Sequence, residues 1–104
     1  MHVYYTGCMG DEVDWRHRGD YIAKHRLTPA QADEAFGDPN RLVIDPDPAS
    51  MSGRTVRVIG WSPSLRQVVT VIVLPDGEVT WGVNAWPANR TDQRRYREEV
   101  GDED

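Results

Sequence analysis

Hydrophobic positions recur with two different periods along this chain, and the change of period divides it into three parts. Up to residue 36 the apolar residues follow helical spacing, whereas from residue 41 to residue 86 they form short runs typical of strands. Residues 90–99 return to a helical but mainly charged pattern, with Asn89 or Thr91 as the cap. The pattern therefore predicts two helices, a group of strands and a final helix.

The first helix is expected over residues 14–25. Trp15 and Ile22 lie two turns apart on one face, and Asp14 stands where a side-chain oxygen can cap the N-terminus. Gly19 disfavours this helix by about 1 kcal/mol relative to Ala. The helix must therefore depend on burial of its apolar face.

The second helix, residues 28–36, has the clearest boundaries. Thr28 is a preferred N-cap residue, Pro29 suits the first helical position, and Gln31 can complete a capping box. Gly37 follows the last apolar residue, as is typical beyond a helix C-terminus. Local residues thus predict both ends of this helix.

Four strands are predicted between the helices, and a loop over residues 46–53 follows the first. The third strand is almost wholly apolar and β-branched, which is typical of a strand covered on both faces. In the fourth strand, alternation puts Val79, Trp81, Val83 and Ala85 on one face and Asn84 and Trp86 on the other. The strands cover residues 41–45, 54–61, 67–74 and 78–86.

This order of elements predicts an α+β fold. We expect a small antiparallel sheet of three to four strands, with two helices before it and one after. A chain of 104 residues has room for one core. The domain is expected at residues 14–97, between an N-terminal arm at residues 1–13, where Val3-Tyr4-Tyr5 could add an edge strand, and an acidic tail at residues 98–104.

The net charge of −5 conceals an uneven distribution of charge. The arm and the tail together contain seven carboxylates and no Lys or Arg, whereas residues 14–97 contain 12 basic and 10 acidic side chains. The body of the chain therefore carries +2, and a nucleic-acid partner is not excluded. Eleven of the basic residues are Arg. This bias suits recognition of phosphate, but genomic base composition is the simpler explanation.

Several sequence features bear on the compartment of the protein. No apolar run reaches the roughly 18 residues that a membrane span needs, and the N-terminus lacks the basic and apolar stretches of a signal peptide. The single Cys8 cannot form an internal disulfide, and the three scattered histidines give no metal-ligand spacing. We therefore expect a cytoplasmic protein with no membrane contact, metal or cofactor.

Lys24 and His25 close the first predicted helix and are candidates for chemistry. His25 can act as a general acid or base near neutral pH, and Lys24 can hold a phosphate. The alternative is an exposed pair of cations that interacts favourably with the C-terminal end of the helix dipole.

Two groups of arginines are candidates for binding phosphate. Arg54, Arg57 and Arg66 lie on or beside neighbouring strands, where they could cradle a phosphate or form a solvated sheet edge. On the last helix, spacings of four and three residues put a second group on one face, which could contact a nucleic-acid backbone or face solvent. This second group is Arg90, Arg94 and Arg97.

Trp86 is the unexpected residue of the last strand. Alternation places it on the polar side, with Asn84 and Thr80. Exposed there, it would be a stacking platform for a base or an anchor for a protein partner, unless a helix or the N-terminal arm covers it. Glu34, on the second helix, is expected to be a solvated carboxylate.

A series of short segments, taken in order, carries a family resemblance. They are Trp15, Ile22-Ala23-Lys24-His25, Leu27-Thr28-Pro29, Glu34-Ala35-Phe36, Asp38-Pro39, Gly53-Arg54, Val58-Ile59-Gly60, Val83-Asn84-Ala85, Arg90 and Arg94-Arg95-Tyr96. Over about residues 14–97 the chain thereby resembles the BrnT family of type II toxins, which have a RelE-like ribonuclease fold.

The resemblance implies mRNA cleavage and neutralisation by a cognate DNA-binding antitoxin. RelE-like ribonucleases use the 2′-hydroxyl of the substrate as nucleophile, so the protein must help to deprotonate it, stabilise phosphorane charge and protonate the leaving oxygen. By position, Lys24 and His25 match the Lys-His pair of the family, and Arg54 matches its Arg at the start of the strand after the loop.

The chain departs from the family pattern at two places. The family has Ser/Thr-Ala-Arg at the end of the last strand, where this chain has Asn84-Ala85-Trp86. A neutral indole cannot replace a cation on the scissile phosphate, and losing one such contact costs on the order of 3 kcal/mol, or about a hundredfold in rate. Arg90 could reach the site instead, and Arg26 replaces the family's Gly after Lys-His.

Two functions therefore remain open. The first is a toxin ribonuclease, and the second is a catalytically degenerate toxin-fold protein that acts by binding an antitoxin-like partner or RNA. In a further hypothesis the acidic tail folds over the basic face and competes for phosphate, the alternative being a solubilising tail. The candidate catalytic residues are Lys24, His25, Arg54 and Arg90, and the candidate RNA-binding residues are Arg57, Arg66, Trp86, Arg94 and Arg97.

Overall fold

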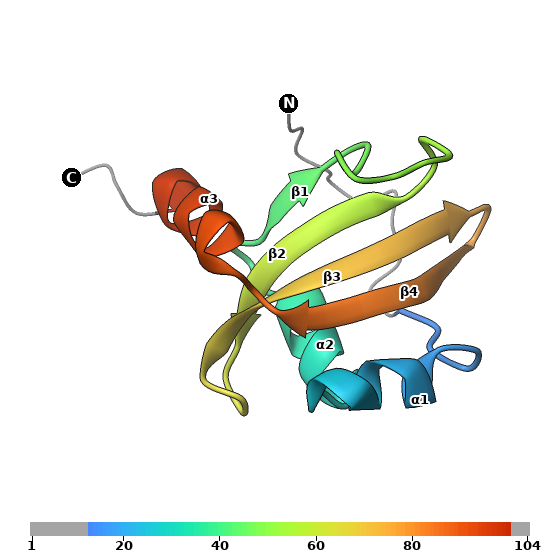
Figure 1. Cartoon of the computed structure of the whole chain (residues 1–104), viewed down its shortest axis with the longest axis horizontal. Helices are drawn as coiled ribbons and strands as arrows, with labels where there is room; N and C mark the ends of the chain where they lie inside the picture. The colour runs from blue at the N-terminus through green and yellow to red at the C-terminus, as the bar shows by residue number, and fades with distance from the viewer. Residues whose placement is uncertain (1–12, 101–104) are drawn as a thin grey trace.

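Helices and strands are segregated along the chain, and the predicted α+β fold is confirmed. A computed structural model describes residues 13–100 (Figure 1). The elements in chain order are α1 (Gly19–Ile22), the 3-10 turn η1 (Ala23–His25), α2 (Pro29–Phe36), β1 (Leu42–Ile44), β2 (Val56–Ser62), β3 (Gln67–Asp76), β4 (Val79–Pro87) and α3 (Arg90–Val100). The arm at residues 1–12, with Val3-Tyr4-Tyr5, and the end of the acidic tail lie outside the described residues.

The four strands of residues 13–100 form one antiparallel sheet in the order β1-β2-β3-β4. Alternate residues of the strands face two separate hydrophobic clusters: Val58 belongs to the cluster that includes α1 and α2, and Ile59 to the cluster that includes Tyr96 of α3. The sheet therefore lies between α1 and α2 on one face and α3 on the other (Figure 1).

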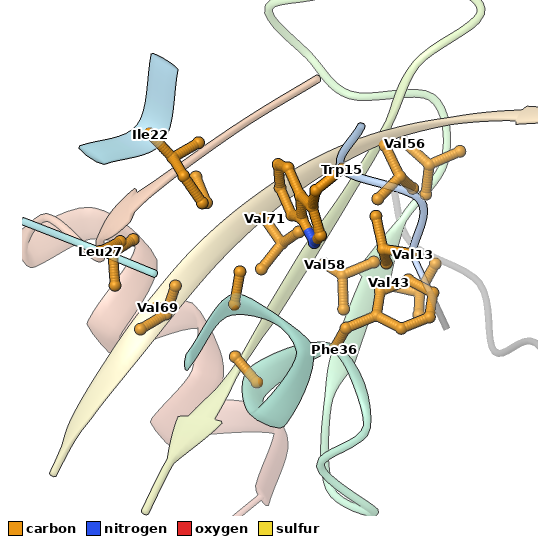
Figure 2. Packing of buried hydrophobic residues seen from close by; sticks show 14 residues of the cluster. Val13, Trp15, Ile22, Leu27, Phe36, Val43, Val56, Val58, Val69 and Val71 are labelled. Atoms are coloured by element: carbon orange, nitrogen blue, oxygen red, sulfur yellow. The ribbon is translucent and has the colours of Figure 1, made fainter. Parts of the chain in front are cut away.

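The larger cluster packs α2 and the segment before α1 against the sheet (Figure 2). Two glycines of the sheet make this close approach possible. A Cβ at Gly82 would lie 2.3 Å from the Trp15 ring, and a Cβ at Gly60 would lie 2.0 Å from the carbonyl oxygen of Ala35. These strand positions must be glycine because the indole and the α2 backbone occupy the space of a side chain.

The predicted capping box of α2 is confirmed. The Thr28 hydroxyl accepts a hydrogen bond from the Gln31 amide at 3.1 Å, and the Gln31 side chain accepts one from the Thr28 amide at 3.1 Å. The Asn89 side chain caps α3 in a similar way, accepting from the Asp92 amide at 2.9 Å. Both helices begin where their sequences predict.

The predicted start of the first helix is wrong. α1 begins at Gly19, and its N-cap, Arg18, makes no side-chain capping hydrogen bond. Asp14 instead extends the free edge of β4: its amide donates to Thr80 at 2.8 Å, and its carbonyl accepts from Gly82 at 2.8 Å. This pairing seats Trp15 against Gly82, and the burial of the indole outweighs the local preference for a helix.

The predicted alternation of the fourth strand also fails, because a bulge interrupts β4. Val73 pairs with Gly82 and Ile72 pairs with Asn84, so Val83 is an extra residue. Beyond it the faces exchange: Gly82 and Ala85 are both buried on the side of α1 and α2. Asn84 and Trp86 remain together on the α3 face, as their spacing of two residues predicts.

Candidate functional site

His25 ends η1 beside the free edge of β4. Its Nδ1 lies 3.1 Å from the carbonyl oxygen of Ala85. A carbonyl oxygen can only accept, so Nδ1 carries the proton and the neutral imidazole presents Nε2 as an acceptor. A ring held in one tautomer, with one nitrogen left for a substrate, is suited to proton transfer.

Trp86 lies next to this imidazole. The ring centroids of His25 and Trp86 are 6.4 Å apart with an edge-to-face angle of 73°. The indole is half-buried, so it is neither fully covered nor fully open to solvent. An aromatic face beside a proton-transfer group could hold a nucleotide base next to a reacting bond.

On the other side of His25, a group that we call the edge cluster comprises Arg18, Tyr21 and Lys24. The Tyr21 ring lies 6.4 Å from the His25 ring, Arg18 Cζ lies 4.0 Å from the Tyr21 centroid, and Lys24 Nζ lies 5.0 Å from it. Arg18 Nε also donates to the carbonyl of Val83, the bulged residue, at 3.0 Å. Two cations therefore share one aromatic ring at the surface.

Arg57 lies on the α3 face of the sheet, with Cζ 5.8 Å from the Trp86 centroid. Its guanidinium group contacts two buried carboxylates, Asp47 at 2.9 Å and Asp92 at 2.8 Å. Asp92 also accepts from Thr70 at 2.8 Å and from Arg95 at 3.0 Å. We call these five residues the ion-pair cluster, in which the charge of Arg57 is already compensated.

The structure separates Arg54 and Arg66 from His25. Ala85 is level with Val71 and Val58 across the sheet, and Arg54 precedes Val58 by four residues. Arg54 lies in the segment before β2, whose first residue is Val56, so it stands beyond that end of the strand. Arg66 stands in the turn at the opposite end of the β2–β3 hairpin, with a positive φ of 62°. Both side chains are exposed, but they cannot meet at one phosphate.

The arginines of α3 form an exposed row. Arg90 is the first residue of the helix and follows Trp86 by four positions. Arg90, Arg94 and Arg97 are all exposed, as a helix face that contacts a nucleic-acid backbone requires. Arg95 instead turns toward Asp92, so the adjacent arginines of this helix have different roles.

Two buried carboxylates, Asp92 and Asp38, accept several hydrogen bonds but carry little signal in the sequence. Asp92, 1% exposed, resembled an ordinary acid in the first turn of a helix. Asp38 accepts hydrogen bonds from the Trp61 amide and the Tyr96 hydroxyl, and burial with this contact raises the pKa of Tyr96. An acid followed three residues later by Arg, as at Asp92 and Arg95, was the only available signal in the sequence.

Glu34 was expected to be solvated, but it anchors the β2–β3 turn. Its Oε1 accepts from the Ser64 amide at 3.0 Å, the Ser64 hydroxyl at 2.9 Å and the Ser62 hydroxyl at 2.7 Å. These donors, the Ser64 amide first, lower the pKa of Glu34. The carboxylate is therefore structural.

No family model, curated protein or solved structure matched this chain. Within residues 13–100, no helix is long and apolar enough to cross a membrane. The same part of the chain contains no group of three or more His, Cys, Asp or Glu side chains that could hold a metal ion.

Proposed function

We propose that the protein is a BrnT-like toxin that cleaves mRNA in the cytoplasm by attack of the substrate 2′-hydroxyl. The observation that carries this proposal is the position of His25, with a fixed tautomer, between Tyr21 and Trp86. The family resemblance includes the same histidine within its Lys-His pair. A single-stranded RNA laid across these rings would present its ribose and phosphate to Nε2.

In the proposed reaction, Nε2 of His25 accepts the proton of the 2′-hydroxyl. The 2′-oxygen then bonds to phosphorus, and the bond from phosphorus to the 5′-oxygen breaks. The Lys24 ammonium protonates that oxygen, and Arg90 compensates the charge of the phosphorane. The products are a 2′,3′-cyclic phosphate and a 5′-hydroxyl, and exchange with water restores both side chains.

The variant His25→Asn tests this role. The Asn amide can still donate to the Ala85 carbonyl, but it offers no basic nitrogen in place of Nε2. We expect cleavage of single-stranded RNA to fall by about 10²- to 10⁴-fold with little change in thermal unfolding. His17→Asn is the matched control, because His17 is exposed and contacts Trp81 instead. Equal activity of His25→Asn and wild type would refute the proposal.

The ion-pair cluster favours a second candidate, a toxin-fold protein that binds without cleaving. Trp86 stands where the family has a cation, and the nearby charge of Arg57 is compensated by two carboxylates. Under this candidate the wild type binds RNA or an antitoxin-like partner, and Trp86→Arg creates or strongly raises cleavage. Vigorous wild-type cleavage that falls in Trp86→Arg would exclude it.

We further propose that a cognate DNA-binding antitoxin neutralises the protein. Induced expression of the chain alone should arrest growth, and co-expression of a small DNA-binding protein encoded beside it should restore growth. Unimpaired growth at high expression, together with intact RNA, would contradict the toxin assignment.

A further inference from the structure

The edge cluster has a property that the proposed cleavage does not explain. Arg18 and Lys24 approach one Tyr ring, yet in the described residues neither cation forms an ion pair with a carboxylate. Asp20, the acidic residue of α1, pairs with neither of them. Two uncompensated cations held close together are a local concentration of positive charge in a chain with net charge −5.

The cluster is also held in place by the fold. The bond from Arg18 Nε to the Val83 carbonyl orients the guanidinium group without neutralising it. Among the described residues no hydrogen bond engages the terminal nitrogens of that group, so their donors remain for the oxygens of a phosphate. Tyr21 is 37% exposed and adds a hydroxyl donor to the same surface.

We propose that Arg18 and Tyr21, beside the proposed general acid Lys24, form a binding subsite for the RNA phosphate that neighbours the cleaved one. This inference rests on the proposed function, because it takes the reacting phosphate to lie at His25. Tyr21 is 6.4 Å from His25, and Lys24 adjoins it in the chain, so an extended strand leaving His25 passes this cluster. Arg18 and Tyr21 thereby become positioning residues for the substrate.

Salt dependence of binding tests the subsite directly. The probe is a 2′-O-methyl hexanucleotide, which can bind but has no 2′-hydroxyl to react. Arg18→Gln should weaken binding by about tenfold at low salt and reduce the slope of log K against log salt by about 0.7, the value for one phosphate on a single strand. Arg66→Gln removes the same charge at the far end of the β2–β3 hairpin and should leave the slope unchanged.

Substrates of different length provide a second test. A dinucleoside monophosphate contains only the phosphate that is cleaved, so Arg18→Gln should cleave it at the wild-type rate. The same variant should lose about tenfold in kcat/KM on a hexanucleotide. Thermal unfolding of Arg18→Gln verifies the fold, because the substitution removes the Arg18–Val83 hydrogen bond.

The outcomes separate the two proposals. An unchanged salt slope in Arg18→Gln, or equal losses on short and long substrates, overturns the subsite and leaves the ribonuclease proposal standing. A wild type that binds the hexanucleotide without cleaving RNA overturns the ribonuclease, whereas the salt slope still decides the subsite. A wild type that binds no RNA overturns both.

Discussion

Arg18 and Arg57 both approach an aromatic ring that contacts His25, but their ionic surroundings differ. Arg57 lies between the buried carboxylates of Asp47 and Asp92, whereas Arg18 donates to the neutral carbonyl of Val83. The charge of Arg57 is compensated by carboxylates of the fold, whereas the charge of Arg18 remains available to a ligand. The number of arginines in a sequence therefore says little about how many can bind phosphate.

The largest effect is expected when Asp92 is removed from the ion-pair cluster. In Asp92→Ala, Arg57 loses a buried ion pair and the Thr70 hydroxyl loses its acceptor. We expect a loss of about 3–5 kcal/mol in the free energy of unfolding, measured by urea denaturation. Asp92→Asn keeps the shape of the side chain, and its free energy of unfolding should lie between those of the wild type and Asp92→Ala. A loss below about 1 kcal/mol would show that the cluster does not hold the fold.

A smaller effect is expected at Arg26, next to the edge cluster. Arg26 adopts the left-handed conformation, with φ of 64°, at the end of η1. Arg26→Gly should raise the free energy of unfolding by about 1 kcal/mol, because glycine adopts this conformation without steric strain. Thermal unfolding measures the change, and Arg97→Gly, in a helix, should instead destabilise. A destabilised Arg26→Gly would show that its side chain has a structural role.

Glu34 extends the comparison to a carboxylate whose partners are neutral. Its folded-state pKa is lowered, so its contribution to stability is present above the unfolded pKa and is lost as the pH falls through the folded pKa. Acidification below about pH 4 should therefore destabilise the wild type more than Glu34→Gln. Unfolding curves at pH 7 and pH 3 measure this difference, and parallel losses in both proteins would argue against it.

The smallest effect on stability is expected in the edge cluster itself. Lys24 is exposed and contacts Tyr21 at 5.0 Å. Lys24→Met should change the free energy of unfolding by no more than about 0.5–1 kcal/mol, the range of an exposed cation–π contact. A change comparable to that of Asp92→Ala, measured in the same urea titration, would remove the distinction between the two clusters.

The sequence was most informative where the structure depends on neighbours in the chain. The capping box at Thr28 and Gln31, the Asn89 cap and the four strands all follow from local chemistry, and the structure contains them, with strand ends shifted by up to two residues. The exceptions depend on distant contacts. Asp14 joins β4 where Trp15 lies on Gly82, and β4 bulges at the next residue, Val83.

The site shows the same contrast between features that depend on neighbours in the chain and features that depend on distant contacts. Lys24, His25 and Trp86 were identified as candidates, and the structure brings His25 and Trp86 together. The commitment of Arg57 to Asp47 and Asp92 could not be foreseen, since these residues lie 10 and 35 positions from it. Arg18 and Tyr21 carry no separate signal in the sequence, because an amphipathic helix accounts for both residues.

The hydrogen bond from His25 to Ala85 has a consequence beyond proton transfer. β4 is the last strand of the sheet, and several of its outer backbone groups, including the Val83 and Ala85 carbonyls, are occupied by the Asp14 backbone, Arg18 and His25. A strand edge with unpaired amides and carbonyls is a template for pairing with another chain. The imidazole that we propose for RNA cleavage thus also covers a backbone acceptor at this edge, and a substitution at position 25 that cannot donate to Ala85 would leave that carbonyl open to pairing.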